Sequence, residues 1–218
     1  IIAYVRPPIS FAVSSFQQRV KGGANLEQLS AKPILPSYRR RFEKFYNLLP
    51  ESAITLKLYD RSRFPEGCVV RDFLQTIGVS PADFERFEIA SANQSLTQPA
   101  VALLLALNDL YPEMPDGRRN ADWPHRMRKI ALSIGGPRFR APAEMLQRTK
   151  ARARDDAAWV SSRLGLDIND FDSPIDESGT AEALRGLAHE DMPAIARFVA
   201  DLCREIDRAE KSPADTET

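Results

Sequence analysis

Residues 1–21 read IIAYVRPPISFAVSSFQQRVK, and this stretch decides the fold class. The apolar run from Ile1 to Val5 ends at Arg6 and a double proline, which predicts a short buried strand. From Ile9 to Lys21 apolar residues recur with a helical period, which predicts an amphipathic helix. A strand followed directly by a helix is the unit from which parallel α/β sheets are built.

The rest of the chain predicts one more strand and a series of helices. Residues 53–59 are rich in apolar and β-branched side chains, which predicts the second strand. Helical periodicity and capping signals predict helices at residues 37–49, 69–77, 99–110, 141–164, 181–188 and 194–210. Loops are expected at residues 60–67 and 167–179, and a disordered tail at 212–218. The predicted fold class is therefore α/β, with a parallel sheet and a predominantly helical C-terminal portion.

The expected sheet is small. Parallel strands are normally buried on both faces within a larger sheet, and two strands are few. The chain also begins with Ile1 rather than Met, within a strand-like run, so we expect that a preceding part of the sheet is missing. The predicted organisation is an α/β part at 1–110, a helical extension at 111–211 and the tail.

The composition is ordinary for a soluble globular protein and excludes several classes. No stretch approaches the ~20 apolar residues that a membrane-spanning helix requires, so no membrane span is expected. The two cysteines, Cys68 and Cys203, are far apart, which is typical of a reducing cytoplasm. The two histidines have no partners at metal-ligand spacing, so no metal site is predicted.

Charge is unevenly distributed although the net charge is zero. Between Arg118 and Arg154 there are eleven Lys or Arg residues and two acids, and the acids outnumber the bases from Asp155 onwards. One interpretation is that these are two solvated helical faces that attract each other. The other is that the basic segment faces an anionic ligand. Nucleic acid is not an expected partner, because aromatic residues are not interleaved with the bases.

Arg6 and Ser14 are the candidate binding residues. Ligands of open α/β sheets bind at the carboxyl ends of the strands, where Arg6 stands. Its guanidinium can grip a phosphate with two parallel hydrogen bonds, and Ser14 in the next helix adds a hydroxyl donor. The alternatives are that Arg6 pairs with an acid at the sheet edge and that Ser14 is an ordinary helix-surface serine.

This segment resembles the sulfotransferase superfamily. Its members bind the 3′-phosphate of 3′-phosphoadenosine 5′-phosphosulfate with an arginine and a serine. The family pattern is Arg-x-Pro, then a serine eight residues after the arginine, then an aromatic residue two positions after the serine. Arg6, Pro8, Ser14 and Phe16 match this pattern. Two further segments resemble segments of this family, in the same order along the chain. Residues 54–79 look like its strand, acidic turn and Phe-Leu-x-x-x-Gly helix. Residues 92–96 look like the corresponding segment of bacterial members that act on carbohydrate-like acceptors.

The resemblance implies an incomplete three-layer, P-loop-like parallel sheet. It implies transfer of a sulfuryl group from 3′-phosphoadenosine 5′-phosphosulfate to a hydroxyl or amine of a carbohydrate or small-molecule acceptor. Arg6 and Ser14 would hold the donor. The family's phosphosulfate-binding loop and catalytic base are expected upstream of Ile1, so no catalytic residue is assigned. The alternatives are a non-catalytic nucleotide-binding or protein-interaction module, and a glycosyltransferase- or kinase-like α/β enzyme.

Three other features received structural interpretations. Asp72 is expected to be a helix-face acid and Phe73 a core aromatic. His125 is expected to be structural or solvent-facing. Residues 135–138, Gly-Gly-Pro-Arg, are a faint match to a later arginine-lysine-glycine element of the same family.

Overall fold

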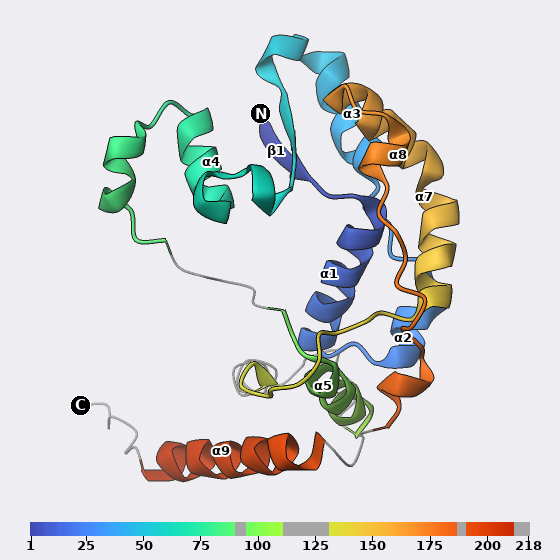
Figure 1. Ribbon diagram of the computed structural model, residues 1–218, viewed down its shortest axis with the longest axis vertical. Coiled ribbons are helices and arrows are strands. Elements are labelled where there is room, and N and C mark those ends of the chain that lie inside the picture. The colour runs from blue at the N-terminus through green and yellow to red at the C-terminus, as the bar shows by residue number, and fades with distance from the viewer. Residues whose placement is uncertain (90–94, 111–130, 187–190, 212–218) are drawn as a thin grey trace, which may run out of the picture. The chain divides into compact units, whose positions relative to one another are not determined.

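The computed structural model describes residues 1–89, 95–110, 131–186 and 191–211 (Figure 1). Within these residues the fold is mixed α/β, mostly helical, with a small parallel sheet. The predicted α/β class is confirmed at this level. No helix among the described residues is long and apolar enough to cross a membrane.

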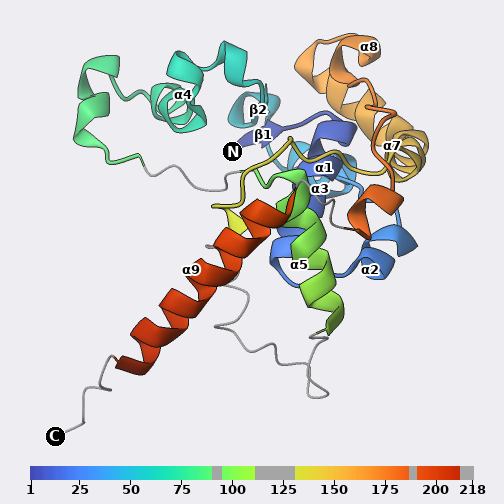
Figure 2. The same ribbon diagram turned by 60° about the horizontal axis from the view of Figure 1, so that its bottom comes forward.

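The sheet consists of β1 (Ile2–Val5) and β2 (Thr55–Leu58), which lie side by side in parallel (Figure 2). Ile2 pairs with Thr55 and Val5 with Leu58. Parallel neighbours need a long crossover connection, and helices α1 (Pro8–Lys21), α2 (Leu26–Ala31) and α3 (Tyr38–Leu48) provide it. Both strands and their parallel pairing agree with the expectation from the sequence.

The chain forms two compact units that alternate along the sequence. The first comprises residues 1–11, 35–94 and 150–174, and the second comprises residues 12–34, 95–149 and 175–218. Helices α1 and α7 (Ala143–Leu164) each contribute residues to both units. The predicted division at residue 110 stays a prediction.

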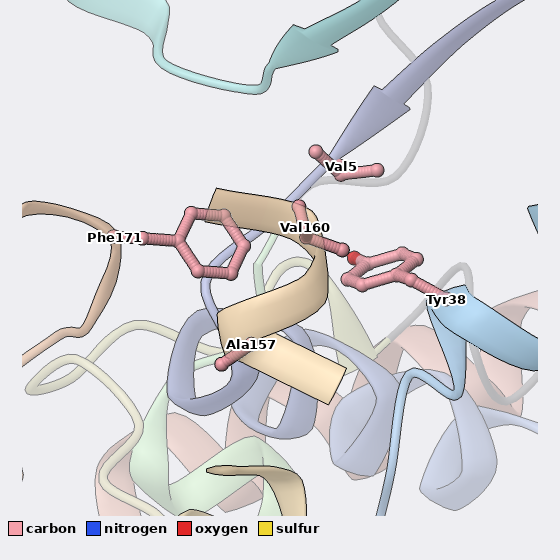
Figure 3. Close-up of a cluster of buried hydrophobic side chains, with 5 residues drawn as sticks. All are labelled: Val5, Tyr38, Ala157, Val160 and Phe171. Atoms are coloured by element: carbon pink, nitrogen blue, oxygen red, sulfur yellow. The ribbon is translucent and has the colours of Figure 1, made fainter. Parts of the chain in front are cut away.

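The core of the first unit joins the end of β1 to helices α3, α7 and α8 (Ile168–Phe171). Figure 3 shows Val160 of α7 between the rings of Phe171 and Tyr38, with Val5 at the strand end nearby. Val5, Val160 and Phe171 are completely buried. This packing fixes the last residue of β1, and therefore the point at which Arg6 leaves the sheet.

The second unit is built from most of α1, with α2, α5 (Gln98–Leu110), the first part of α7 and α9 (Met192–Lys211). The rings of Phe16 and Phe139 stack in its core, with their centroids 5.2 Å apart. The buried side chain of Gln17 accepts a hydrogen bond from the backbone N–H of Leu96 at 2.7 Å. Asn108 of α5 donates to the carbonyl oxygens of Val20, in the last turn of α1, and of Ala24, which follows the helix.

Several short elements differ from the expectations. The predicted loop at 60–67 contains two 3-10 turns, η2 (Arg61–Arg63) and η3 (Pro65–Gly67), and the loop at 167–179 contains α8. The helix predicted at 181–188 is wrong within the described residues, where Glu182–Leu184 form only the 3-10 turn η5 and residues 185 and 186 are not helical; residues 187–190 lie outside the described residues. Helix α2 and the 3-10 helix η4 (Pro81–Arg86) were not predicted, since both are too short to show a period.

Candidate functional site

Arg6 and Tyr59 stand next to each other at the carboxyl end of the sheet. Each follows the last residue of a strand, and those last residues, Val5 and Leu58, are paired. The backbone N–H of Tyr59 donates to the carbonyl oxygen of Val5 at 2.7 Å, so the parallel register continues to this residue. The pairing therefore brings a cationic and an aromatic side chain to the edge at which α/β sheets bind ligands.

The Arg6 guanidinium lies over the aromatic ring of Tyr59. Its central carbon is 3.9 Å from the ring centroid, which is a close cation–π contact. No acid among the described residues forms an ion pair with Arg6. Within these residues, the alternative expectation of an ion pair at the sheet edge is therefore not met.

The backbone of Arg6 is fixed by α3. Its N–H donates to the hydroxyl of Tyr38 at 2.8 Å. Burial raises the pKa of Tyr38, against the opposing effects of the Arg6 hydrogen bond and charge, so the hydroxyl stays protonated. Two backbone N–H groups at the start of α3, those of Tyr38 and Arg39, donate to the carboxylate of Asp156 at 2.8 and 2.7 Å. Asp156 thus takes over the capping role that Ser37 does not perform.

Ser14 lies within α1 and is half-buried. It belongs to the second compact unit, whereas Arg6 belongs to the first. The helix that carries Ser14 begins two residues after Arg6, as the sequence predicts. A phosphate site shared by the two residues stays a prediction.

A second polar cluster links both strands to α4 (Val69–Thr76). The carboxylate of Asp72 accepts a hydrogen bond from the Tyr4 hydroxyl at 2.5 Å and forms a 2.6 Å ion pair with Lys57. Lys57 also donates to the hydroxyl of Thr76 at 3.0 Å. Asp72 was expected to be a helix-face acid, and it lies on α4 with its carboxylate bound to both strands. The expectation that Phe73 is a core aromatic is wrong. Asp72 is buried and Phe73 is 41% exposed, because the strand lysine draws the carboxylate inwards.

The protonation states of this cluster follow from its contacts. Burial and the hydrogen bond to Asp72 raise the pKa of Tyr4 to about 12. Burial acts to raise the pKa of Asp72, but the hydrogen bonds from Lys57 and Tyr4 and the charge of Lys57 lower it overall. At neutral pH Tyr4 is therefore a hydrogen-bond donor and Asp72 a carboxylate. The cluster is suited to holding α4 against the sheet rather than to acid–base chemistry.

The basic segment falls only partly within the described residues. Residues 118–130, including His125, lie outside them. Of the remaining bases, Arg140 pairs with Asp176 at 3.2 Å and Lys150 with Asp172 at 2.7 Å. For Arg140 and Lys150, these ion pairs favour the interpretation in which the basic and acidic segments attract each other. Arg138, in the faint arginine-lysine-glycine match, is exposed.

Sequence reasoning missed the roles of Tyr59 and Tyr38. Tyr59 was expected only as the end of a strand, and Tyr38 only as part of the helix predicted at residues 37–49. One signal could have identified Tyr59: if the two predicted strands pair in parallel and end together, the residues after them become neighbours. No comparable signal links the Tyr38 hydroxyl to the backbone of Arg6.

The described residues offer no group of three His, Cys, Asp or Glu side chains that could hold a metal ion. A second cation lies beside the Tyr59 ring, because the side chain of Arg61 forms a hydrogen bond with Tyr59 that raises the pKa of Arg61.

Comparisons with known proteins give one partial similarity. Over 118 residues, 54% of its length, the chain is 29% identical to a protein of Archaeoglobus fulgidus that is described as an uncharacterized protein. The matched part is 33% of that protein, so the chain spans well under half the length of this curated relative. No protein-family model matches the chain, and no solved structure matches it.

Proposed function

We propose that the chain is part of a sulfotransferase-like α/β domain that uses 3′-phosphoadenosine 5′-phosphosulfate as its sulfuryl donor. In this proposal Arg6 and Ser14 hold the 3′-phosphate of the donor, and the parallel pair β1–β2 belongs to a three-layer, P-loop-like sheet. The acceptor is a hydroxyl or amine of a carbohydrate or small molecule. The single observation that carries the proposal is the Arg6 guanidinium at the carboxyl end of β1, stacked on Tyr59 with no described acid to neutralise it.

The chemistry of a guanidinium supports an anion at this position. Arginine presents its N–H donors in a rigid fork that matches phosphate oxygens, and such charge-assisted bonds are stronger than neutral ones. An arginine at the strand ends that no described acid neutralises is therefore a favourable place for a phosphate. A 3′-phosphate contact also lets a site distinguish this donor from nucleotides that lack that group.

The proposed reaction is an in-line displacement at sulfur. The acceptor oxygen or nitrogen forms a bond to sulfur while the bond from sulfur to the bridging phosphate oxygen breaks. The proton of the acceptor passes to a base, and 3′,5′-bisphosphoadenosine leaves. Arg6 and Ser14 would contribute positioning of the donor, which raises the rate by fixing the reacting groups in line. No residue of the chain is assigned as the base.

Calorimetric titration of the wild-type chain with 3′,5′-bisphosphoadenosine and with 5′-AMP tests the proposal. We expect the bisphosphate to bind more tightly, because only it carries the 3′-phosphate. Arg6→Ala should weaken bisphosphate binding by roughly ten- to a hundredfold, since a charge-assisted bond contributes about 1.5–3 kcal/mol. Binding of 5′-AMP should change little, and Ser14→Ala should have a smaller effect of the same kind.

Arg40→Ala is the matched control, because Arg40 is an exposed arginine of α3 in the same compact unit. It should leave both affinities unchanged. Equal affinity of the wild-type chain for the two nucleotides would refute donor recognition by Arg6. Selective binding alone is also what the alternative of a non-catalytic nucleotide-binding module predicts, because no residue of the chain is assigned as the base.

A further inference from the structure

The aromatic residues around Arg6 form a connected group within the first unit. The ring of Tyr59 contacts the guanidinium of Arg6 on one side. It meets the ring of Phe64 edge-on, with centroids 5.4 Å apart and an interplanar angle of 80°. Phe64 is buried, with 7% of its surface exposed, and it meets Tyr4 of β1 edge-on at 5.7 Å. Tyr59 is therefore held by its ring as well as by its backbone.

We propose that Tyr59 is a positioning residue that holds the Arg6 guanidinium ready to receive a phosphate group. This inference rests on the proposed function and adds to it the residue that orients the phosphate-binding side chain. The proposal is based on the 3.9 Å distance from the Arg6 guanidinium carbon to the centroid of the Tyr59 ring.

The Tyr59 ring and a phosphate bind different parts of the Arg6 guanidinium. Cation–π attraction acts at the face of an aromatic ring, and arginine favours stacked contacts with such faces. The N–H donors of arginine lie in the plane of the group and point away from its face. Stacking on Tyr59 therefore leaves N–H donors of Arg6 for oxygen ligands, whereas an ion pair with a carboxylate would occupy them.

The contacts of Arg6 also restrict its freedom of movement. An arginine side chain has several rotatable bonds, and a ligand that immobilises it loses affinity in proportion to the freedom removed. In this structure the backbone N–H of Arg6 is bound to Tyr38 and its guanidinium rests on Tyr59. The side chain is restrained at both ends, so part of that loss has already occurred before a phosphate arrives.

A purely structural role for Tyr59 makes a different prediction. If Tyr59 only packs against Phe64, its replacement lowers stability and weakens all nucleotides alike. If Tyr59 positions Arg6, its replacement lowers the preference for 3′,5′-bisphosphoadenosine over 5′-AMP. The ratio of the affinities for 3′,5′-bisphosphoadenosine and 5′-AMP therefore distinguishes the positioning role of Tyr59 from a purely structural one. A structural change that weakens both nucleotides equally leaves this ratio unchanged.

The experiment measures this ratio by calorimetry for the wild-type chain, Tyr59→Leu, Tyr59→Phe and Arg6→Ala. Tyr59→Leu removes the aromatic face and should reduce the ratio roughly three- to tenfold, the range expected for loss of one partly exposed cation–π contact. Tyr59→Phe keeps the face and should keep the ratio. In the Arg6→Ala background, Tyr59→Leu should have no further effect on it.

The matched control is Tyr46→Leu, which removes another aromatic face from beneath an arginine. Arg163 lies over the Tyr46 ring at 4.6 Å, in the same compact unit. This variant should leave the ratio unchanged. If Tyr59→Leu reduces the folded fraction, Tyr59→Met takes its place, since the longer, flexible side chain fills more of the vacated volume.

Failure of this inference and failure of the proposed function give different results. If the wild-type chain shows no preference for the bisphosphate, donor recognition itself is wrong and the positioning role falls with it. If the preference is present and Arg6→Ala abolishes it, but Tyr59→Leu keeps it, the proposed function stands and the positioning role of Tyr59 is refuted. A reduced ratio in Tyr59→Leu and a preserved ratio in Tyr59→Phe support the inference.

Discussion

Replacing Tyr4 by phenylalanine tests the polar cluster that connects the sheet to α4. The Tyr4 hydroxyl donates to the Asp72 carboxylate at 2.5 Å, while its ring packs edge-on against Phe64. Tyr4→Phe keeps the ring contact and removes only the donor. Asp72 then retains its ion pair with Lys57 as the remaining strong contact of its carboxylate.

The expected loss at neutral pH is about 1–2 kcal/mol of unfolding free energy. Hydrogen bonds to a charged partner contribute roughly 1.5–3 kcal/mol to stability, and partial exposure of this cluster reduces that value. Lys57 limits the loss further, because it continues to neutralise the carboxylate when the hydroxyl is absent. A complete loss of folding is therefore not expected.

The loss should depend on pH with a defined sign. Folding lowers the pKa of Asp72, whereas an unfolded aspartate titrates near ~3.9. The stabilisation is therefore fully present above about pH 4 and disappears as the pH falls through the lower, folded pKa of Asp72. The difference in unfolding free energy between the wild-type chain and Tyr4→Phe should shrink over the same pH range, because it depends on the ionised carboxylate of Asp72.

Urea unfolding followed by circular dichroism at about pH 7 and about pH 3 measures this difference. Tyr46→Phe is the control, because the Tyr46 hydroxyl forms no hydrogen bond within the described part of the chain and its removal should cost little. In an Asp72→Asn background Tyr4→Phe should cost clearly less than in the wild-type chain. A loss at neutral pH below about 0.3 kcal/mol, or one equally large in the Asp72→Asn background, would refute the charge-assisted bond.

Two further predictions concern the backbone. At Gly179 an added Cβ would lie 2.1 Å from the carbonyl oxygen of Ala141, two residues before α7, so Gly179→Ala should lower the free energy of unfolding by about 1–3 kcal/mol. Gly135 has open space around it, so the control Gly135→Ala should be nearly neutral. Equal melting temperatures of the two variants in thermal unfolding would contradict the close approach at Gly179. Asp156→Asn should speed hydrogen exchange of the Tyr38 amide, because it removes the charge that caps α3, at a cost of about 0.5–2 kcal/mol. Its exposed neighbour is the control: Asp155→Asn should leave that amide unchanged, and similar exchange in both variants would contradict the cap.

The sequence predicted the strands and the longer helices because each carries its own pattern. Helix α1 shows the apolar period over 14 residues and β2 a β-branched, apolar run. Helix α2 has only 6 residues and was missed. It depends on a local capping box between Asn25 and Gln28, a signal that does not involve periodicity.

The orientation of α4 could not be predicted, because it depends on a partner elsewhere in the chain. Its pattern offers Phe73 as a core residue, yet the helix buries Asp72 and Leu74 instead. The deciding contact is the ion pair with Lys57 on β2, which makes burial of an acid favourable. A buried charge that is paired and hydrogen-bonded is tolerated where an isolated one is not.

The sequence predicted the position of Arg6 in the candidate site, but not the residues that surround it. Arg6 stood out because a cation follows a buried strand. Its contact with Tyr59 requires the parallel register, in which Val5 pairs with Leu58, and neither strand specifies that register alone. The hydrogen bond from the Arg6 backbone to Tyr38 requires the packing of α3, which Asp156 of α7 helps to fix.

The register also explains why no carboxylate from the described part of the chain lies beside Arg6. Asp60 directly follows Tyr59, and a shift of one residue would put an acid where the aromatic ring now lies. In the observed register Asp60 caps the turn η2 instead, where it accepts hydrogen bonds from both the backbone and the hydroxyl of Ser62. These bonds and the charge of Arg63 lower the pKa of Asp60, so this acid is ionised and already satisfied. Among the described residues Arg6 therefore has an aromatic partner that restrains it and no acid that neutralises it, which is the condition under which its charge can attract a phosphate.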